Sequence, residues 1–74
     1  MNRTYEFTMQ LSAEKTRIIY QGQARFLLVT TDHGIKLQLP AQNFRSYVTN
    51  EGINGRFSVE IDEDNKILQL SKSV

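Results

Sequence analysis

Arginines that stand close to aromatic residues are the part of this sequence whose chemistry comes nearest to a binding site. Four such groups occur: Arg17 with Tyr20, Arg25 with Phe26, Arg45 with Phe44 and Tyr47, and Arg56 with Phe57. A guanidinium group binds phosphate or carboxylate with two parallel hydrogen bonds, and exposed aromatic rings stack on bases. If the fold gathers these groups, they would form a surface for RNA or single-stranded DNA. Because the net charge is only +1, we favour the alternative in which the aromatic rings fill the core and the arginines border it.

Catalytic chemistry has little support in the sequence. The one histidine, His33, stands in a turn-forming stretch with Asp32 and Gly34, and the chain has no cysteine. A general base needs a positioned partner and a nucleophile or metal within reach. No G-x-S-x-G elbow or phosphate-binding G-x-x-x-x-G-K motif is present. We expect no catalytic residues. An enzyme built on Asp32 and His33 is the third hypothesis, after a binding module and a nucleic-acid-binding domain.

The acidic run that begins at Asp62 resembles the opening of a calcium loop. Such a loop needs a glycine at its sixth position and a glutamate at its twelfth, where this chain has Ile67 and Ser73. A hydrated hairpin turn is therefore expected, with no metal and no cofactor.

The small barrels that bind cyclic dinucleotides are a minor alternative, because the arginine pair of their signature is absent from this sequence.

A glycine pair, Gly52 and Gly55, precedes a clear strand pattern. The loop is too short for a phosphate motif. We therefore interpret the two glycines as part of a bend in which one or both adopt φ values that other residues rarely adopt. Ile53 is expected to pack against Phe44 or Val48.

Periodicity predicts the elements that must position these side chains. Alternation predicts a strand from Tyr5 to Leu11 and another from Phe57 to Ile61, followed by a turn and a final strand over "ILQLS". Ser12 and Gly22 are typical of the start and end of a helix from Ala13 to about Gln21.

The middle of the chain predicts a hairpin and a second helix. The run Arg25–Thr31 indicates a strand buried on both sides, the turn at Asp32–Gly34 follows, and a strand with alternating apolar residues starts at Ile35. Pro40 ends that strand and opens a short helix of about two turns, because it fixes φ and lacks an N–H. Ala41, Phe44, Tyr47 and Val48 fall on one face of this helix.

These elements give a small α+β domain in the order β-α-β-β-α-β-β. Five strands form one mainly antiparallel sheet or a partly closed barrel, with two short helices on its open side. The 74 residues form a single domain, which can bury only about 60% of its unfolded surface. The N-terminal stretch alternates polar and apolar residues, so we expect no signal peptide, no contact with a membrane and a cytoplasmic location.

Four motifs in this order resemble a known family: "YQGQA" from Tyr20, "DHG" from Asp32, "LQLPAQNFRSYVT" from Leu37 and "GINGRF" from Gly52. The family comprises uncharacterised bacterial proteins of about this length, found mainly in gammaproteobacteria and classed as a domain of unknown function. The resemblance covers about Tyr5 to Leu70 and implies a stand-alone bacterial domain, with no activity or ligand to carry over.

The family's recurrent residues fall here on Tyr20, Gln21, Gly22, Pro40, Ala41, Phe44, Arg45, Gly52, Ile53, Gly55 and Phe57. Packing and backbone geometry explain most of them, but they explain Gln21 and Arg45 poorly.

We therefore expect a non-enzymatic binding or protein-interaction module, with a homodimer as one form. The alternative is a small nucleic-acid-binding domain. The candidate binding surface comprises Gln21, Arg45, Asn54, Arg56, Arg25 and Tyr20.

Overall fold

The structure is a computed structural model that describes residues 1–73. Its elements follow the predicted order: β1 (Arg3–Leu11), α1 (Ala13–Tyr20), β2 (Phe26–Thr30), β3 (Lys36–Pro40), the 3₁₀-helix η1 (Ala41–Tyr47), β4 (Ile53–Ile61) and β5 (Ile67–Ser73). The α+β class is confirmed. None of the described helices is long and apolar enough to cross a membrane.

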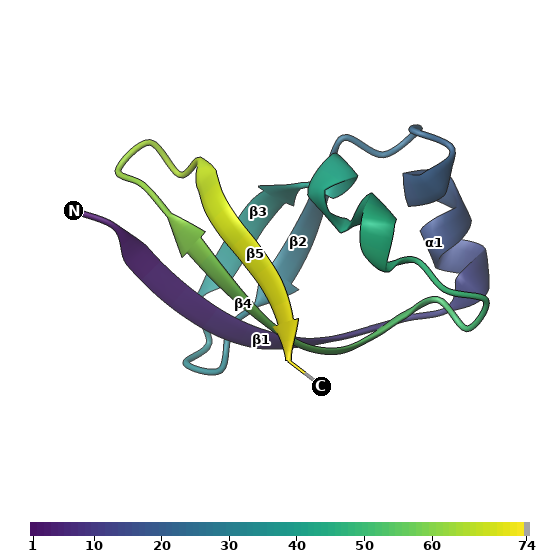
Figure 1. Ribbon diagram of the computed structural model, residues 1–74, viewed down its shortest axis with the longest axis horizontal. Helices are drawn as coiled ribbons and strands as arrows, with labels where there is room; N and C mark the ends of the chain where they lie inside the picture. Colours follow the sequence, from purple (N-terminus) through teal and green to yellow (C-terminus); the bar gives the residue numbers. More distant parts are fainter. Residues whose placement is uncertain (74) are drawn as a thin grey trace.

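The strands form two antiparallel sheets that do not close into a barrel. One sheet has the order β1-β4-β5, and the other is the hairpin β2-β3. Figure 1 shows the hairpin behind the larger sheet, with α1 and η1 at the same end of the molecule. A backbone hydrogen bond of 2.9 Å from the Asp32 N–H to the Glu6 carbonyl joins the two sheets at the hairpin turn. The expected single sheet is thus divided into two, because β1 and β2 are not paired as neighbouring strands.

Three phenylalanines at the centre of the core fix how η1 lies on the larger sheet. Phe7 of β1 stacks on Phe57 of β4 with ring centroids 5.7 Å apart, and Phe44 of η1 meets Phe57 edge-on at the same distance. Tyr47 also meets Phe57 edge-on at 5.1 Å, and its hydroxyl donates to the Leu70 carbonyl at 3.1 Å. One helix is therefore attached to both β4 and β5.

The second helix is a 3₁₀-helix, and its sequence spacing explains this. Ala41, Phe44 and Tyr47 recur every third residue, which matches the three residues per turn of a 3₁₀-helix. Ala41 and Phe44 are buried and Tyr47 is half-buried. The predicted apolar face is confirmed for these three residues, whereas Val48 lies just beyond the helix.

The prediction that the Arg25–Thr31 strand is buried on both sides is wrong. In β2, Val29 is buried and Leu27 is half-buried, but the side chains of Phe26 and Leu28 are 54% and 68% exposed. A two-stranded sheet has two faces, and only the face with Leu27 and Val29 packs on the core.

The two glycines of the predicted bend have different places. Gly52 closes a tight turn with Thr49, at a φ of +101°, and a Cβ there would lie 1.9 Å from the Leu11 carbonyl oxygen. Gly55 lies within β4, so the bend ends before it. Ile53 is fully buried in the same core cluster as Phe44, with Val48 packed against that cluster.

Candidate functional site

The C-terminus of α1 positions the first of the candidate residues. Gly22, at a φ of +76°, donates its N–H to the Ile19 carbonyl, and Gln23 donates to the Ile18 carbonyl. This pair of bonds is a Schellman motif, which ends a helix with a left-handed glycine. The predicted roles of Gly22 at the helix end and of Ser12 at its start are confirmed, since the Ser12 hydroxyl accepts from the Lys15 N–H at 3.2 Å.

Tyr20, in the last turn of α1, meets Arg45 of η1. The guanidinium carbon of Arg45 lies 5.0 Å from the centroid of the Tyr20 ring, in cation–π contact. Both side chains are exposed. The contact joins two residues far apart in the sequence, and it covers one face of the only aromatic ring on α1.

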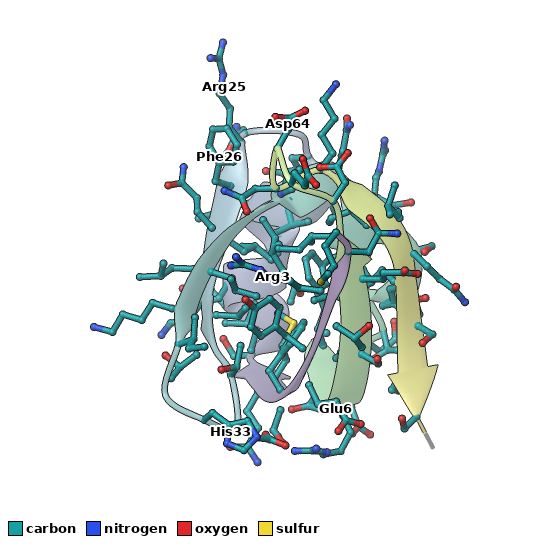
Figure 2. All side chains as sticks on the ribbon, turned by 90° about the vertical axis from the view of Figure 1, so that its left-hand side faces the viewer. Arg3, Glu6, Arg25, Phe26, His33 and Asp64 are labelled. Carbon is teal, nitrogen blue, oxygen red and sulfur yellow. The ribbon has the colours of Figure 1, made fainter. Side chains whose placement is uncertain are left out.

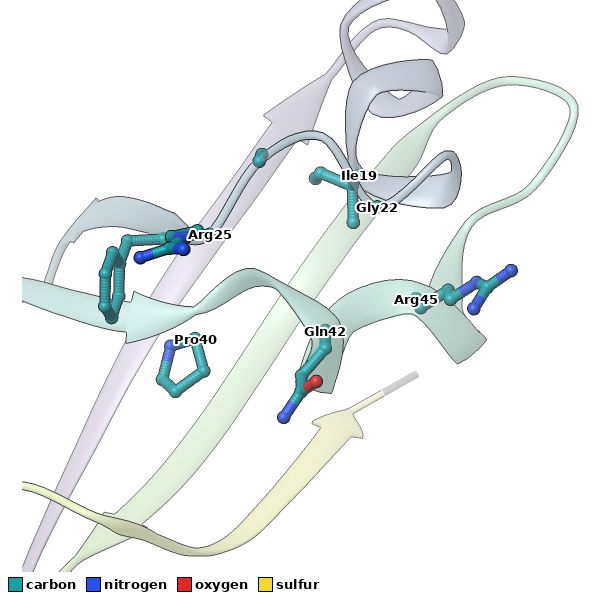
Figure 3. Close-up of a pocket in the computed structure, with 8 residues that line it drawn as sticks. Ile19, Gly22, Arg25, Pro40, Gln42 and Arg45 are labelled. Carbon is teal, nitrogen blue, oxygen red and sulfur yellow. The ribbon is translucent and has the colours of Figure 1, made fainter.

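A groove begins beside this contact, between the end of α1, the start of β2 and η1. Its cavity has a volume of about 410 Å³. We call it the arginine groove; it is lined by Ile19, Gly22, Ala24, Arg25, Phe26, Pro40, Gln42 and Arg45. Figure 3 shows Arg25 and Arg45 at opposite ends of the groove, with Pro40 and Gln42 between them. Apolar Ile19, Ala24 and Pro40 and polar Gln42 line the groove, and the Arg45 side chain points away from Pro40 and Gln42 (Figure 3).

Neither arginine of the groove is neutralised by the described part of the chain. The two ion pairs found within residues 1–73 are Arg56 with Asp32, and the N-terminal amine with Glu63. Both Arg25 and Arg45 are exposed. Their donors are thus open to groups from outside the chain.

The outer side of β2 continues the groove along the hairpin. Phe26 pairs with Pro40 and Leu28 pairs with Gln38, so these four side chains share one side of the two-stranded sheet. We call this surface, comprising Phe26, Leu28, Gln38 and Pro40, the β2 face. Figure 2 shows Arg25 and Phe26 at one end of the hairpin and His33, beside Glu6, at the other.

Arg56 lies elsewhere. Its guanidinium forms two hydrogen bonds with the Asp32 carboxylate, at 2.9 and 2.6 Å, and a third with the Thr8 hydroxyl at 3.1 Å. Arg56 alternates along β4 with buried Phe57, so the sheet separates it from η1 and Arg45. The fold therefore does not bring together Arg45 and Arg56, both named in the candidate surface.

The Arg56–Asp32 pair shifts both ionisation equilibria. The hydrogen bonds from Arg56 and its positive charge hold the pKa of Asp32 below its ordinary value, with a smaller contribution from His33. The same hydrogen bonds raise the pKa of Arg56. The pair joins the hairpin turn to β4 across β1, which is a structural role.

The remaining candidates are separate from the groove. Asn54 donates its side-chain amide to the Glu51 carbonyl at 3.1 Å, within its own turn. Gln21 is the C-terminal cap of α1, with its backbone N–H bonded to Arg17 and its side chain exposed. Tyr20, Arg25 and Arg45 are thus the predicted residues that the fold brings together.

The acidic turn forms the hairpin that the sequence predicts. One oxygen of the Asp62 carboxylate accepts hydrogen bonds from the backbone of Asp64 at 2.8 Å and Lys66 at 2.9 Å, and Asn65 adopts a positive φ of 63°. No cluster of three or more histidine or acidic side chains suited to a metal ion occurs among residues 1–73.

Sequence reasoning did not identify Leu28 and Gln42 as surface residues of interest. The run "FLLV" has no alternation that would tell the inward side chains from the outward ones. The pairing of Leu28 with polar Gln38 across the hairpin carries the missing signal, because it places a polar residue on that face.

Comparison with known proteins gives one assignment. No curated protein and no solved structure matches the chain. Residues 3–73 match the family described as "Protein of unknown function (DUF2835)". Since this match spans nearly the whole sequence, the chain belongs to that family.

Proposed function

We propose that the protein is a non-enzymatic interaction module that binds another polypeptide through the β2 face. One observation carries the proposal: Phe26 and Leu28, at alternating positions of β2, are 54% and 68% exposed. Two exposed apolar side chains on one side of a strand offer a partner apolar surface to cover. Covering the exposed part of each would contribute about 1 kcal/mol to binding.

The surroundings of this face suit binding better than catalysis. Arginine and tyrosine are enriched among the residues that dominate binding energy at interfaces, and Arg25, Arg45 and Tyr20 border the same end of the hairpin. Asp32, the carboxylate nearest to His33 in sequence, is already engaged by Arg56. Asp32 thus has a structural role in the fold.

A random-peptide display library, panned against the protein, tests the proposal. The matched control for selection is the double variant Phe26→Ser and Leu28→Ser, which changes exposed side chains and should fold. We expect peptides that bind the wild-type protein and lose binding to the variant. Peptides that bind both proteins equally, or a failure to select any, would contradict the proposal.

A second copy of the chain is one partner that could occupy the β2 face. Light scattering over a dilution series from micromolar concentration measures this directly. A dimer should dissociate in the Phe26→Ser and Leu28→Ser variant, whereas a monomer at every concentration would remove the homodimer from the proposal.

Single-stranded nucleic acid is a second candidate ligand, favoured by the contact of Arg45 with Tyr20 and the nearby Arg25 and Phe26. Such binding would weaken steeply with added salt, because each phosphate contact releases counterions. Of the arginines and tyrosines that the sequence suggests for this role, Arg56 is engaged by Asp32 and Tyr47 by Leu70. Unchanged chemical shifts on titration with an oligonucleotide at low salt would exclude this ligand.

A further inference from the structure

We infer that the arginine groove binds an acidic peptide segment in which two carboxylates flank apolar residues. This inference rests on the proposed function, because the groove opens at the Phe26 end of the β2 face, and it names the chemistry of the partner. Three features of the groove lead to it.

The first feature is the separation of the two positive charges. Arg25 and Arg45 lie at opposite ends of the groove, and their side chains do not converge on one point (Figure 3). A single phosphate or carboxylate therefore cannot engage both. An extended ligand with one anionic group near each end matches this arrangement, since each guanidinium can bind one carboxylate bidentately.

The second feature is the apolar floor. Between the two arginines lie half-buried Ala24 and Pro40 and buried Ile19, with the exposed ring of Phe26 at the border. Apolar side chains of a ligand would be covered here, and Gln42 offers an amide to its backbone. A sugar–phosphate backbone has no comparable apolar group.

The third feature separates a peptide from a nucleic acid. One face of the Tyr20 ring is covered by the guanidinium of Arg45 at 5.0 Å, so that face is not open to a base. Base stacking on aromatic rings is a main source of affinity for single strands. The other face of Tyr20 and the exposed ring of Phe26 stay open, so the choice of an acidic peptide rests on the two separated arginines and the apolar residues between them.

The test uses acetylated, amidated peptides in which two glutamates flank one, two or three leucines. Control peptides carry glutamine in place of both glutamates. Binding to the wild-type protein is followed by NMR, through the side-chain Nε–Hε signals of Arg25 and Arg45 and the backbone amides of the groove. We expect one of the glutamate peptides to shift both arginine signals, and its glutamine counterpart to shift neither.

Protein variants then locate the contacts. Arg25→Gln and Arg45→Gln should each weaken binding about fivefold, as expected for an exposed ion pair. Arg3→Gln and Arg17→Gln remove the same charge outside the groove lining and should leave affinity unchanged. Equal weakening by all four variants, or no binding of any glutamate peptide, would overturn the inference.

Three further outcomes decide between the groove, the β2 face and nucleic acid. If an oligonucleotide of thymidines shifts both arginine signals and the peptides do not, the groove binds nucleic acid and the inference is wrong. If display-selected peptides require Phe26 and Leu28 but tolerate Arg25→Gln and Arg45→Gln, the proposed function stands and the groove inference fails. If glutamate peptides need both arginines while no selected peptide depends on Phe26 and Leu28, the groove stands and the β2 face fails.

Discussion

The outer side of the β1-β4-β5 sheet and the outer side of the β2-β3 hairpin differ in the polarity of their side chains and in the pairing of their charges. On the larger sheet the outward positions of β1 and β4 are polar, Thr8, Arg56 and Ser58 among them, and the charge of Arg56 is paired with Asp32. On the hairpin the outward positions carry Phe26 and Leu28, and the neighbouring Arg25 has no acidic partner among residues 1–73.

This difference is the basis of the proposed binding surface. A polar surface is stable in water without a partner. An exposed apolar pair beside two unneutralised arginines is better explained by contact with another molecule. The central claim is that the β2 face and the arginine groove, and not the Arg56 side of the sheet, form the binding surface.

The largest expected effect is on stability, and it compares a buried side chain with an exposed one. Phe57→Ala should lower the free energy of unfolding by about 4 kcal/mol, because it removes the ring that Phe7, Phe44 and Tyr47 all contact. Leu28→Ala should change it by less than about 0.5 kcal/mol, since that side chain is 68% exposed. Urea denaturation of both variants measures this. A loss of more than about 1.5 kcal/mol for Leu28→Ala would mean that Leu28 is covered in the isolated protein.

The next effect compares two glycines with positive φ. Gly52→Ala should cost about 3 kcal/mol, because its Cβ would overlap the backbone at the junction of β1 and α1. Gly34→Ala, in the hairpin turn, has a φ of +82° but no atom within 4 Å of the added Cβ, so only the cost of the left-handed conformation, about 1 kcal/mol, is expected. Thermal unfolding of the pair checks this order. Equal destabilisation would mean that the close approach of Gly52 to Leu11 is absent in solution.

A smaller effect on stability compares half-buried Tyr47 of η1 with exposed Tyr20 of α1. Tyr47→Phe should destabilise the protein by about 1 kcal/mol, because the Leu70 carbonyl loses its hydrogen bond from the Tyr47 hydroxyl. Tyr20→Phe keeps the ring that Arg45 covers and should be neutral in stability. Chemical denaturation compares the two. A neutral Tyr47→Phe variant would show that η1 is held by packing alone.

The smallest effect is the pH dependence due to Asp32. Because Arg56 lowers the pKa of Asp32 in the folded state, this pair stabilises the protein at pH values above the ordinary pKa of an aspartate. That stabilisation is lost as the pH falls through the lowered pKa, when the carboxylate becomes protonated. NMR titration should give a low pKa for Asp32 and a return toward the ordinary value in Arg56→Gln. An unshifted Asp32 in the wild-type protein would contradict the pairing.

Local patterns in the sequence predict much of the fold. Alternation identifies β1 and β4, the flanking Ser12 and Gly22 delimit α1, and the three-residue spacing from Ala41 to Tyr47 predicts η1. These features depend on neighbours within one element, which the sequence displays directly.

Relations between distant elements could not be predicted in the same way. The division into two sheets depends on whether β1 pairs with β2, and the sequence contains no signal for that choice. Arg56 finds Asp32, 24 positions away, and Arg45 finds Tyr20 through the packing of η1 against α1. The fold brings Tyr20 and Arg45 into contact and places Arg25 in the same groove as Arg45, whereas Arg56, also named in the candidate surface, lies on the other side of the sheet.

Chemical-shift mapping of the wild-type protein with a display-selected peptide tests the central claim most directly. The account predicts that the largest changes occur at Phe26, Leu28 and Arg45, with little change at Thr8, Arg56 and Ser58. The largest changes at Thr8, Arg56 and Ser58, with Phe26 and Leu28 unaffected, would contradict it.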